Sequence, residues 1–419
     1  MPFRAALSGI NVAGSDLRVI GHNVANASTT GFKGSRAEFV DVYANAAEGA
    51  SANSIGSGVR LASVTQQFGQ GNIGFTDNKL DLAISGRGFF ILDDNGAKVY
   101  SRNGIFSVDR DGFVVNSADQ KLVMSETDEK GVLTGGVGPL RIDKSNINPR
   151  PTSLVEVGVN LDSGESPPLS VPFDPATPTS FTHSTSMTMY DSLGVEHLAT
   201  FYYVKGEVAN TWDTHLFIDG KDAKNGVAPP YAPDTITFDG GGRLATLNGQ
   251  PVPPGRFTYP DFPVETGAVP MKVTVDLIGA TPTTQYGGKF DVNALTQNGY
   301  TTGRVIGVDV DETGYITTRY SNGQSKQLGL VSLADFANPQ GMRQMGDTSW
   351  AESFSSGTPL VGTPGSGTVG LLQPGALEDS NVDLTTELVK MIIAQRNFQA
   401  SAQIVRTADT VTQTVINIR

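Results

Sequence analysis

The stretch "PFRAALSGINVAGSDLRVIGHNVANASTTGFKG", Pro2 to Gly34, decides how the chain begins. Its apolar side chains recur every seven residues, which is the spacing of a helix that buries one seam. The two positions of this repeat are Phe3, Ile10, Leu17 and Val24, and Ala6, Ala13, Ile20 and Ala27. After Ala27 the period gives way to Ser and Thr, which compete with helical hydrogen bonds, and to Gly31, which allows a turn. We therefore predict a helix that ends near Ala27.

A second helix is predicted at the other end of the chain, in "SNVDLTTELVKMIIAQRNFQASAQIVRTADTVTQTVINIR", Ser380 to Arg419. Asp383, alone or with Ser380, is a suitable N-cap, and the helix should run for roughly 35 residues. Its apolar stripe comprises Leu384, Leu388, Met391, Phe398, Val405 and Ala408, and it is broadened by Ile404, Val411, Val415 and Ile418. Either helix alone would be marginal in water, so we expect the two to pair.

Pairing would leave outer faces with small residues, and these allow other helices to approach closely. They are Ala5, Ser8, Gly9, Gly14 and Ser15 at the N-terminal end, and Ala394, Ala400 and Ser401 at the C-terminal end. We interpret the two ends as a helical packing surface between subunits.

The middle of the chain reads as β-structure. Short apolar runs are separated by "DNG", "RNG" and "RDG" between residues 94 and 112, and later by "DETG" and "SNG". These are hairpin-turn signals, because Asn, Asp and Gly tolerate positive φ. Of the 23 prolines, 17 lie from Pro149 to Pro282, which marks a separate all-β domain with long loops.

The predicted fold is multidomain and mainly β, with paired N- and C-terminal α-helices in a coiled-coil-like arrangement and nested discontinuous domains. The predicted boundaries are 1–30 with 378–419 for a terminal helical assembly domain, 31–71 with 358–377 for an extended connecting region, 72–148 with 285–357 for a discontinuous β domain, and 149–284 for an inserted Pro-rich outer β domain.

Composition excludes several classes of function. The net charge of −12 argues against binding to nucleic acid, whose phosphates it would repel. The chain has no cysteine, which excludes disulfides, Cys-ligated zinc and Cys nucleophiles. The sequence has no run of 18 apolar residues, so no membrane-spanning helix is predicted. The first residues do not resemble a cleaved signal peptide.

No catalytic, cofactor-binding or metal-binding residues are predicted. "GQGNIG", Gly69 to Gly74, fits a nucleotide-loop pattern, but no helical period follows it, so a loop entering a β domain is expected. His197 and His215 could form a metal site or a base with Asp191 or Asp213, although their spacing fits no known motif. We expect them to be solvated positions on strands, and we expect the protein not to be an enzyme.

The N-terminal stretch resembles the signature of the flagellar axial proteins, the family of rod, hook and hook-associated subunits. The family pattern is Ser-Gly-Leu/Ile, then Asn-hydrophobic-Ala-Asn, then Thr-x-Gly-Phe-Lys. "SRNGIF", Ser101 to Phe106, and "GALEDSNVDLTTELVKMIIAQRNFQASAQIVRTAD", Gly375 to Asp409, resemble its other landmarks. The first landmark, a helix-to-linker motif, matches at Asn23, Asn26, Thr30, Gly31, Phe32 and Lys33.

Within this family, the chain length and the single large insert favour the hook class. The resemblance then implies a subunit that polymerises into a curved tube and carries torque from rod to filament as a universal joint. The implied partners are other copies of the chain, a rod protein at the proximal end, a hook-filament junction protein at the distal end, the hook cap during assembly and the flagellar type III export apparatus.

The implied location is the extracellular hook, reached through the flagellar channel without a cleaved signal peptide. The alternatives are a distal rod or hook-filament junction protein within the family and, outside it, a secreted β-rich enzyme or adhesin.

Overall fold

The computed structural model describes residues 2–42, 56–128, 132–224, 229–253 and 255–417. The chain forms two compact units. Unit 1 comprises Met1–Lys144, Ile306–Arg319 and Ser325–Arg419, and unit 2 comprises Ser145–Val305 and Tyr320–Gln324. Because unit 2 interrupts unit 1, the predicted nested and discontinuous organisation is confirmed.

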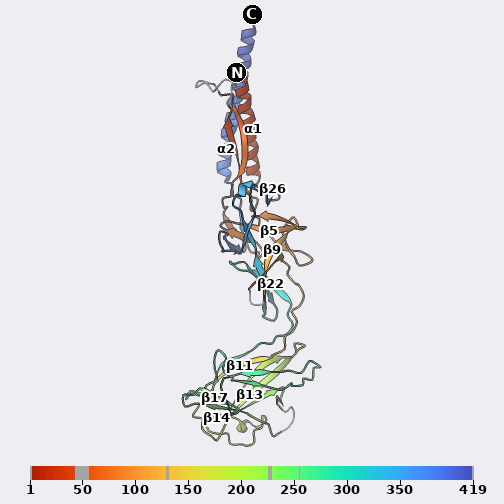
Figure 1. The fold of residues 1–419 in the computed structure, drawn as a ribbon, viewed down its shortest axis with the longest axis vertical. Helices are drawn as coiled ribbons and strands as arrows, with labels where there is room; N and C mark the ends of the chain where they lie inside the picture. Colours follow the sequence, from red (N-terminus) through yellow and green to blue (C-terminus); the bar gives the residue numbers. More distant parts are fainter. Residues whose placement is uncertain (1, 43–55, 129–131, 225–228, 254, 418–419) are drawn as a thin grey trace. The chain divides into compact units, whose positions relative to one another are not determined.

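The two terminal segments form the long helices α1 (Pro2–Ala25) and α2 (Leu384–Asn417). Figure 1 shows them side by side, and they run antiparallel because Asn23 contacts Glu387 whereas Gly9 lies beside Ser401. Asp383 caps α2 as predicted, since its carboxylate accepts the Thr386 N–H at 2.6 Å. The predicted pair of terminal helices is thus confirmed.

A β-hairpin of strands β1 (Ser35–Asp41) and β2 (Val59–Gln66) lies along α1. The Val59 N–H donates to the Ser8 hydroxyl oxygen at 3.2 Å, which fixes the start of β2 against the helix. The sequence predicted an extended connection over 31–71; within the described residues, this segment contributes a hairpin that packs on α1.

The β region of unit 1, residues 72–144, 306–319 and 325–378, is built on a branched antiparallel sheet and two short two-stranded ladders. Its main path runs β22-β23-β24-β9-β5-β6-β27-β26. Residues Phe90, Leu92, Leu122 and Leu333 lie in its core. The strands that make up the region are β3 (Ile73–Phe75), β4 (Leu82–Ser85), β5 (Phe89–Asp94), β6 (Ala97–Ser101), β7 (Ser107–Val108), β8 (Val114–Val115), β9 (Lys121–Thr127), β10 (Leu133–Pro139), β22 (Val305–Val310), β23 (Tyr315–Tyr320), β24 (Ser325–Val331), β25 (Leu333–Asp335), β26 (Arg343–Gly346), β27 (Ser349–Ala351), β28 (Leu360–Gly362), β29 (Leu371–Pro374) and β30 (Ala376–Glu378).

Most of the predicted hairpin turns lie where the turn signals placed them. Asn95 and Gly96 have φ of 52° and 95° between β5 and β6, and Gly112 and Gly314 also have positive φ in their turns. The turn predicted at "RNG" is wrong. Arg102–Gly104 forms a loop between β6 and β7, and a Cβ on Gly104 would clash with the Leu82 carbonyl oxygen.

Unit 2 contains a four-stranded sheet in the order β19-β20-β11-β21 and a seven-stranded sheet with the path β12-β13-β14-β16-β17-β18. Both sheets contribute to one core, which includes Val157, Tyr203 and Trp212. The strands are β11 (Leu154–Asn160), β12 (His183–Tyr190), β13 (Glu196–Lys205), β14 (Thr211–Ile218), β15 (Lys221–Asp222), β16 (Asp234–Phe238), β17 (Leu244–Leu247), β18 (Gln250–Pro251), β19 (Arg256–Thr258), β20 (Thr274–Asp276) and β21 (Asp291–Gln297).

The limits of unit 2 differ from the predicted insert of 149–284. Strand β21, which the predicted boundary left outside the insert, pairs antiparallel with β11 and belongs to unit 2. At the C-terminal side, β29 pairs with β4, so part of the predicted connecting segment 358–377 is built into the β region of unit 1.

Candidate functional site

The contact between α1 and α2 includes Gly9 and Ser401, small residues that were predicted on the outer faces of the helices. Ala6, Ala13 and Ile20 on α1 and Ala394 on α2 are buried. These positions repeat every seven residues on α1, as expected for a helix pair seam. Because the inner face carries small side chains, much of the larger apolar surface of the two helices lies outside this contact.

Some of the predicted packing residues of α1 are exposed and others are half-buried. Phe3 is 52% exposed, whereas Ile10, Leu17 and Val24 are half-buried beside the seam. The heptad pattern therefore identified the apolar positions correctly, but the buried centre of the seam is the second set, Ala6, Ala13 and Ile20.

On α2, predicted packing residues Leu384, Leu388, Phe398 and Val411 are exposed, and Met391 and Val405 are half-buried. Val415 lies in the helix, but its side chain is outside the described part of the structure, as is Ile418. Further exposed residues missed by the predicted stripe complete a surface that we call the α2 apolar surface. Its members are Leu384, Leu388, Val389, Ile392, Ile393, Phe398, Ile404, Val411 and Ile416, which are 38% to 65% exposed.

The helix-to-linker motif begins with Asn23, which is buried where α1 ends. Its amide makes two hydrogen bonds with the backbone of Ser35, the first residue of β1, each 2.8 Å long. The same Nδ2 lies 3.2 Å from Glu387 Oε2 on α2. Asn23 thus joins α1, β1 and α2.

Asn26 makes local contacts near the end of α1. Its Nδ2 donates to the His22 carbonyl oxygen at 2.9 Å, and its Oδ1 accepts the Thr29 hydroxyl. Thr30 follows as a half-buried residue. Gly31 then has φ of 70°, and its N–H donates to the Glu378 carbonyl oxygen at 2.7 Å. The turn after α1 is therefore held against the segment that leads into α2.

Phe32 is buried, and its ring centroid lies 5.5 Å from that of His22. The neighbouring Gly34 N–H donates to Asn381 Oδ1 at 2.8 Å, while Asn381 Nδ2 donates to the carbonyl oxygens of Gln67 and Gly69. Asn381 is therefore a junction residue that sequence reasoning missed, although it lies in the C-terminal landmark.

Lys33 is completely buried and forms an ion pair with the equally buried Glu378, with Nζ and Oε1 2.6 Å apart. Arg102 approaches the other carboxylate oxygen, with Nη1 3.0 Å from Oε2. Burial lowers the pKa of both cations, and the Glu378 carboxylate opposes this effect. Sequence reasoning singled out Lys33 but missed Arg102 and Glu378, even though both belong to family landmarks.

In unit 2, the prediction that His197 and His215 are solvated is wrong, because each is only 4% exposed. His197 lies between Asp219, 2.6 Å from Nδ1, and Asp191, 3.3 Å from Nε2. His215 instead stacks on Phe173 with centroids 4.0 Å apart. The two histidines therefore belong to separate clusters, each covered by a loop.

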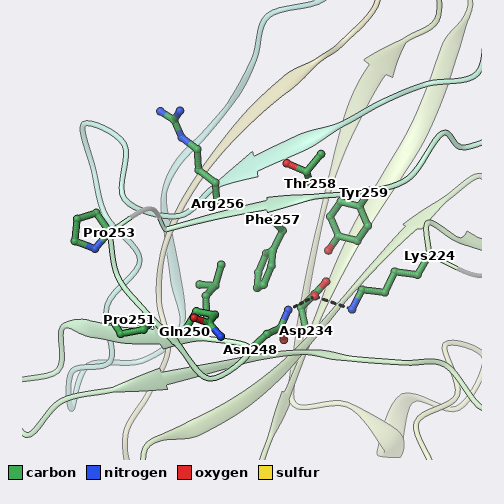
Figure 2. Close-up of a pocket in the computed structure, with 11 residues that line it drawn as sticks. Lys224, Asp234, Asn248, Gln250, Pro251, Pro253, Arg256, Phe257, Thr258 and Tyr259 are labelled. Carbon is green, nitrogen blue, oxygen red and sulfur yellow. Dashed lines mark hydrogen bonds and ion pairs between the residues drawn. The ribbon is translucent and has the colours of Figure 1, made fainter.

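A pocket of about 630 Å³ in unit 2 has polar groups in its wall. Figure 2 shows Lys224 and Asn248 both directed to Asp234, at 2.6 and 2.8 Å from Oδ1. The three residues come from different segments of unit 2, and their polar groups bind one another. Among the described residues, no group of three His, Asp or Glu side chains could hold a metal ion.

Comparison with known proteins shows the family to which the chain belongs. The flagellar hook protein FlgE of Salmonella typhimurium is 35% identical over 423 residues, covering 100% of both chains. The chain belongs to the flagellar hook protein family.

Other hook-family relatives agree. FlgE of Escherichia coli is 35% identical over 100% of both chains, and FlgE of Borreliella burgdorferi is 30% identical over 99% of this chain and 98% of its own. Family models match "Flagellar hook protein FlgE/F/G D1 domain" at 83–159, "Flagellar basal body protein FlaE D2 domain" at 160–300 and "Flagellar basal body rod FlgEFG protein C-terminal" at 373–418.

The crystal structure of Helicobacter pylori flagellar hook protein FlgE2 matches with a TM-score of 0.53 at 12% identity, covering 73% of this chain and 99% of that one. At this identity it supports the fold alone, and it confirms the predicted mainly β fold class. The predicted resemblance to the flagellar axial proteins is also confirmed. This hook-family chain is a structural subunit of the flagellar hook, which is part of the external flagellum. None of its described helices is long and apolar enough to cross a membrane.

Proposed function

We propose that this hook-family chain polymerises through its terminal helices into a curved tube that acts as a universal joint and transmits torque from rod to filament. The observation that supports this most directly is the α2 apolar surface, which one copy of the chain leaves exposed. Membership of the hook family leads us to expect that the chain forms a hook. The exposed surface of α2 is the part through which we expect copies of the chain to associate.

The α2 apolar surface is wider than one stripe. Leu388 and Ile392 are four residues apart, and so are Val389 and Ile393, which gives two neighbouring rows in addition to the face that meets α1. A helix that is apolar on most sides is normally buried. Fully burying such a side chain contributes about 1.5–3 kcal/mol, so covering both rows would favour association strongly.

Helix α1 offers a complementary feature. A Cβ built on Gly14 has no described atom within 4 Å, and the adjacent Ser15 has a small side chain. An α2 helix of another copy could therefore approach closely. A contact between unlike surfaces, repeated without closing into a ring, produces a helical tube.

The remaining parts of the proposal follow from family membership. The chain would join a rod protein proximally and a hook-filament junction protein distally, grow beneath a hook cap, and leave the cell through the flagellar type III export apparatus. The terminal helical assembly domain would be 1–30 with 378–419. We infer a mechanical role and no enzymatic one, in keeping with the mutual pairing of Lys224, Asn248 and Asp234 in the unit 2 pocket.

The test is electron microscopy of hooks from cells that carry Ile393→Asp or Phe398→Asp as their only copy of the chain. Both positions are on the α2 apolar surface, and Gln395→Asp is the control, because it adds the same charge at an exposed polar position of the same helix. We expect few or no hooks from the first two variants and normal hooks from the control.

Fluorescence of Trp212 and Trp350, one in each unit, would show whether the β-structure remains folded in each variant. Normal hooks from both Ile393→Asp and Phe398→Asp would overturn the proposal that this surface joins subunits.

A further inference from the structure

Three family landmarks far apart in the sequence meet at one carboxylate. Lys33 comes from the helix-to-linker motif, Arg102 from "SRNGIF", and Glu378 from the segment before α2. Lys33 and Arg102 approach different oxygens of Glu378, at 2.6 and 3.0 Å. The landmarks therefore share one structural centre.

The charge balance of this cluster makes Glu378 its essential member. The side chains of Lys33 and Glu378 are 0% exposed, and that of Arg102 is 5% exposed. A buried charge without a partner is strongly destabilising. The Asp335 carboxylate attracts Arg102 from farther away. Without the charge of Glu378, two buried cations would therefore face each other with no carboxylate between them.

Backbone groups tie the cluster to neighbouring segments. The Gly71 N–H donates to Glu378 Oε1 at 2.8 Å, Lys33 Nζ donates to the Gly69 carbonyl oxygen, and Arg102 Nη2 donates to the Gly86 carbonyl oxygen. A Cβ on Gly71 would clash with the Asp379 carbonyl oxygen, so only glycine fits at this position of the loop.

These contacts lie where the helices are connected to the β region of unit 1. Lys33 follows α1 by eight residues, and Glu378 precedes α2 by six residues. Arg102 belongs to the β region itself, between β6 and β7. A force that turns the helix pair against the β region would have to displace this cluster.

We propose that the Lys33–Glu378–Arg102 cluster is the torsional coupling between the terminal helix pair and the β region of unit 1, with Glu378 as its positioning residue. This rests on the proposed function, because a coupling of this kind matters where subunits carry torque. Its mechanism is electrostatic: one carboxylate holds two cations from different segments in a fixed relation.

The first test uses the sign of an interaction between substitutions. Hooks are purified from Lys33→Gln, Glu378→Gln and the double variant, all carrying Trp212→Phe so that Trp350 reports on unit 1. We expect Glu378→Gln to lower the thermal midpoint by roughly 10 °C, and Lys33→Gln alone to lower it less.

Adding Lys33→Gln to Glu378→Gln should then raise the midpoint, because it removes one of two repelling cations. Additive losses would indicate that the residues merely fill space and would overturn the proposal. If Glu378→Gln prevents hook formation, the double variant should restore it, and a failure to restore hooks would count equally against the proposal.

The second test measures positioning directly. The natural chain has no cysteine, so spin labels can be attached to single cysteines introduced by substitution. We choose two exposed positions, Gln395 on α2 and Lys98, which lies in β6 close to the turn between β5 and β6. In hooks diluted with unlabelled subunits, we expect a narrow distance distribution for the parent chain and a broad one for Glu378→Gln. A label pair at Glu196 and Lys272 in unit 2 should not change.

An unchanged narrow distribution in Glu378→Gln would overturn the role of Glu378. If the parent chain formed no hooks at all, the proposed function would fail instead. The same two label pairs in the unassembled full chain would then still decide whether Glu378 positions the helices.

Discussion

Gly9 on α1 lies so close to Ser401 on α2 that a Cβ placed on Gly9 would be 2.8 Å from the Ser401 hydroxyl oxygen. Ala6 on α1 and Ala394 on α2 are also buried. The two helices therefore approach each other through small residues, and their separation is set by the absence of a side chain at Gly9.

Gly9→Leu is expected to force the helices apart. Overpacking of this kind costs about 1–3 kcal/mol, and we expect the loss to appear as a lower thermal midpoint of helical circular dichroism in the full chain. Gly14→Leu is the matched control, because its Cβ would meet no described atom within 4 Å and Leu favours the helix by about 0.8 kcal/mol over Gly.

The control has a second use. If Gly14 admits the helix of a neighbouring subunit, Gly14→Leu should leave the isolated chain stable and reduce the number of hooks. Equal destabilisation of the isolated chain by both substitutions would contradict the helix contact described here.

Gly31→Ala is expected to disrupt the junction after α1. The residue has φ of 70°, and its Cβ would lie 2.5 Å from the Asn103 backbone nitrogen and 2.6 Å from the Arg102 carbonyl carbon. Strain at positive φ and a clash with backbone together should cost about 2–4 kcal/mol. Urea unfolding followed by Trp350 fluorescence would measure this loss.

Gly96→Ala separates the two causes of that loss. Gly96 has φ of 95°, but its Cβ would meet no described atom within 4 Å. This variant should show only the conformational cost, about 1 kcal/mol. A loss for Gly31→Ala no greater than that for Gly96→Ala would mean that the close contact with residues 102–103 is unimportant.

Local patterns predicted the helices and most hairpin turns, because these depend on neighbouring residues. The pairing of the helices was predicted because either helix alone would be marginal in water. "DNG" formed the turn between β5 and β6, whereas "RNG" did not form one. Arg102 of "RNG" instead forms a buried ion pair with Glu378, 276 residues away in the sequence. A turn signal contains no information about a partner so distant.

Contacts between residues far apart in the sequence also explain why other features of the structure were not predicted. His197 and His215 lie on strands with polar neighbours, but loops that carry Asp191 and Phe173 cover them. On α2, the apolar stripe included Leu388 but could not show that Leu388 would be exposed and Ala394 buried. Which apolar face meets which partner depends on tertiary packing.

Unit 2 is expected to lose stability on acidification because of His215. Burial and, to a smaller extent, the charge of Lys224 lower the pKa of His215 to about 4, although the Asp234 carboxylate acts in the opposite direction. The unfolded chain therefore takes up a proton between its ordinary pKa of about 6.5 and pH 4, while the folded chain does not. The contribution of His215 to stability should be constant above pH 6.5 and fall by about 3 kcal/mol as the pH drops to 4.

The measurement is urea unfolding between pH 4 and 8, followed by Trp212 in a Trp350→Phe chain. His215→Phe, which can keep the stack on Phe173, should flatten this acid limb. His197 has the opposite sign: burial lowers its pKa, but Asp219 and Asp191 outweigh this and raise it. Its contribution is present below pH 6.5 and is lost as the pH rises above that value, so His197→Asn should lower stability below pH 6.5 and remove the decline above it.

Asn23→Asp is expected to separate α1 from β1 although it barely changes the shape of the side chain. The new carboxylate cannot donate to the Ser35 carbonyl oxygen, and it would lie beside Glu387. This part of the helix pair already repels negative charge, since burial raises the pKa of Asp16 and Glu387 raises it further. The loss should be about 2–4 kcal/mol at pH 7.

A pH titration distinguishes this mechanism from a general loss of packing. Once protonated, the carboxyl group introduced by Asn23→Asp can again donate to Ser35, so its pKa in the folded variant should lie above the ordinary value of about 3.9. Stability of the variant should therefore fall as the pH rises from about 4 and recover on acidification, relative to the parent chain. Asn11→Asp on the exposed face of α1 is the control and should change stability by less than about 0.5 kcal/mol. If Asn23→Asp and Asn11→Asp had equal stability at pH 7, the amide of Asn23 would not be what holds β1 to the end of α1.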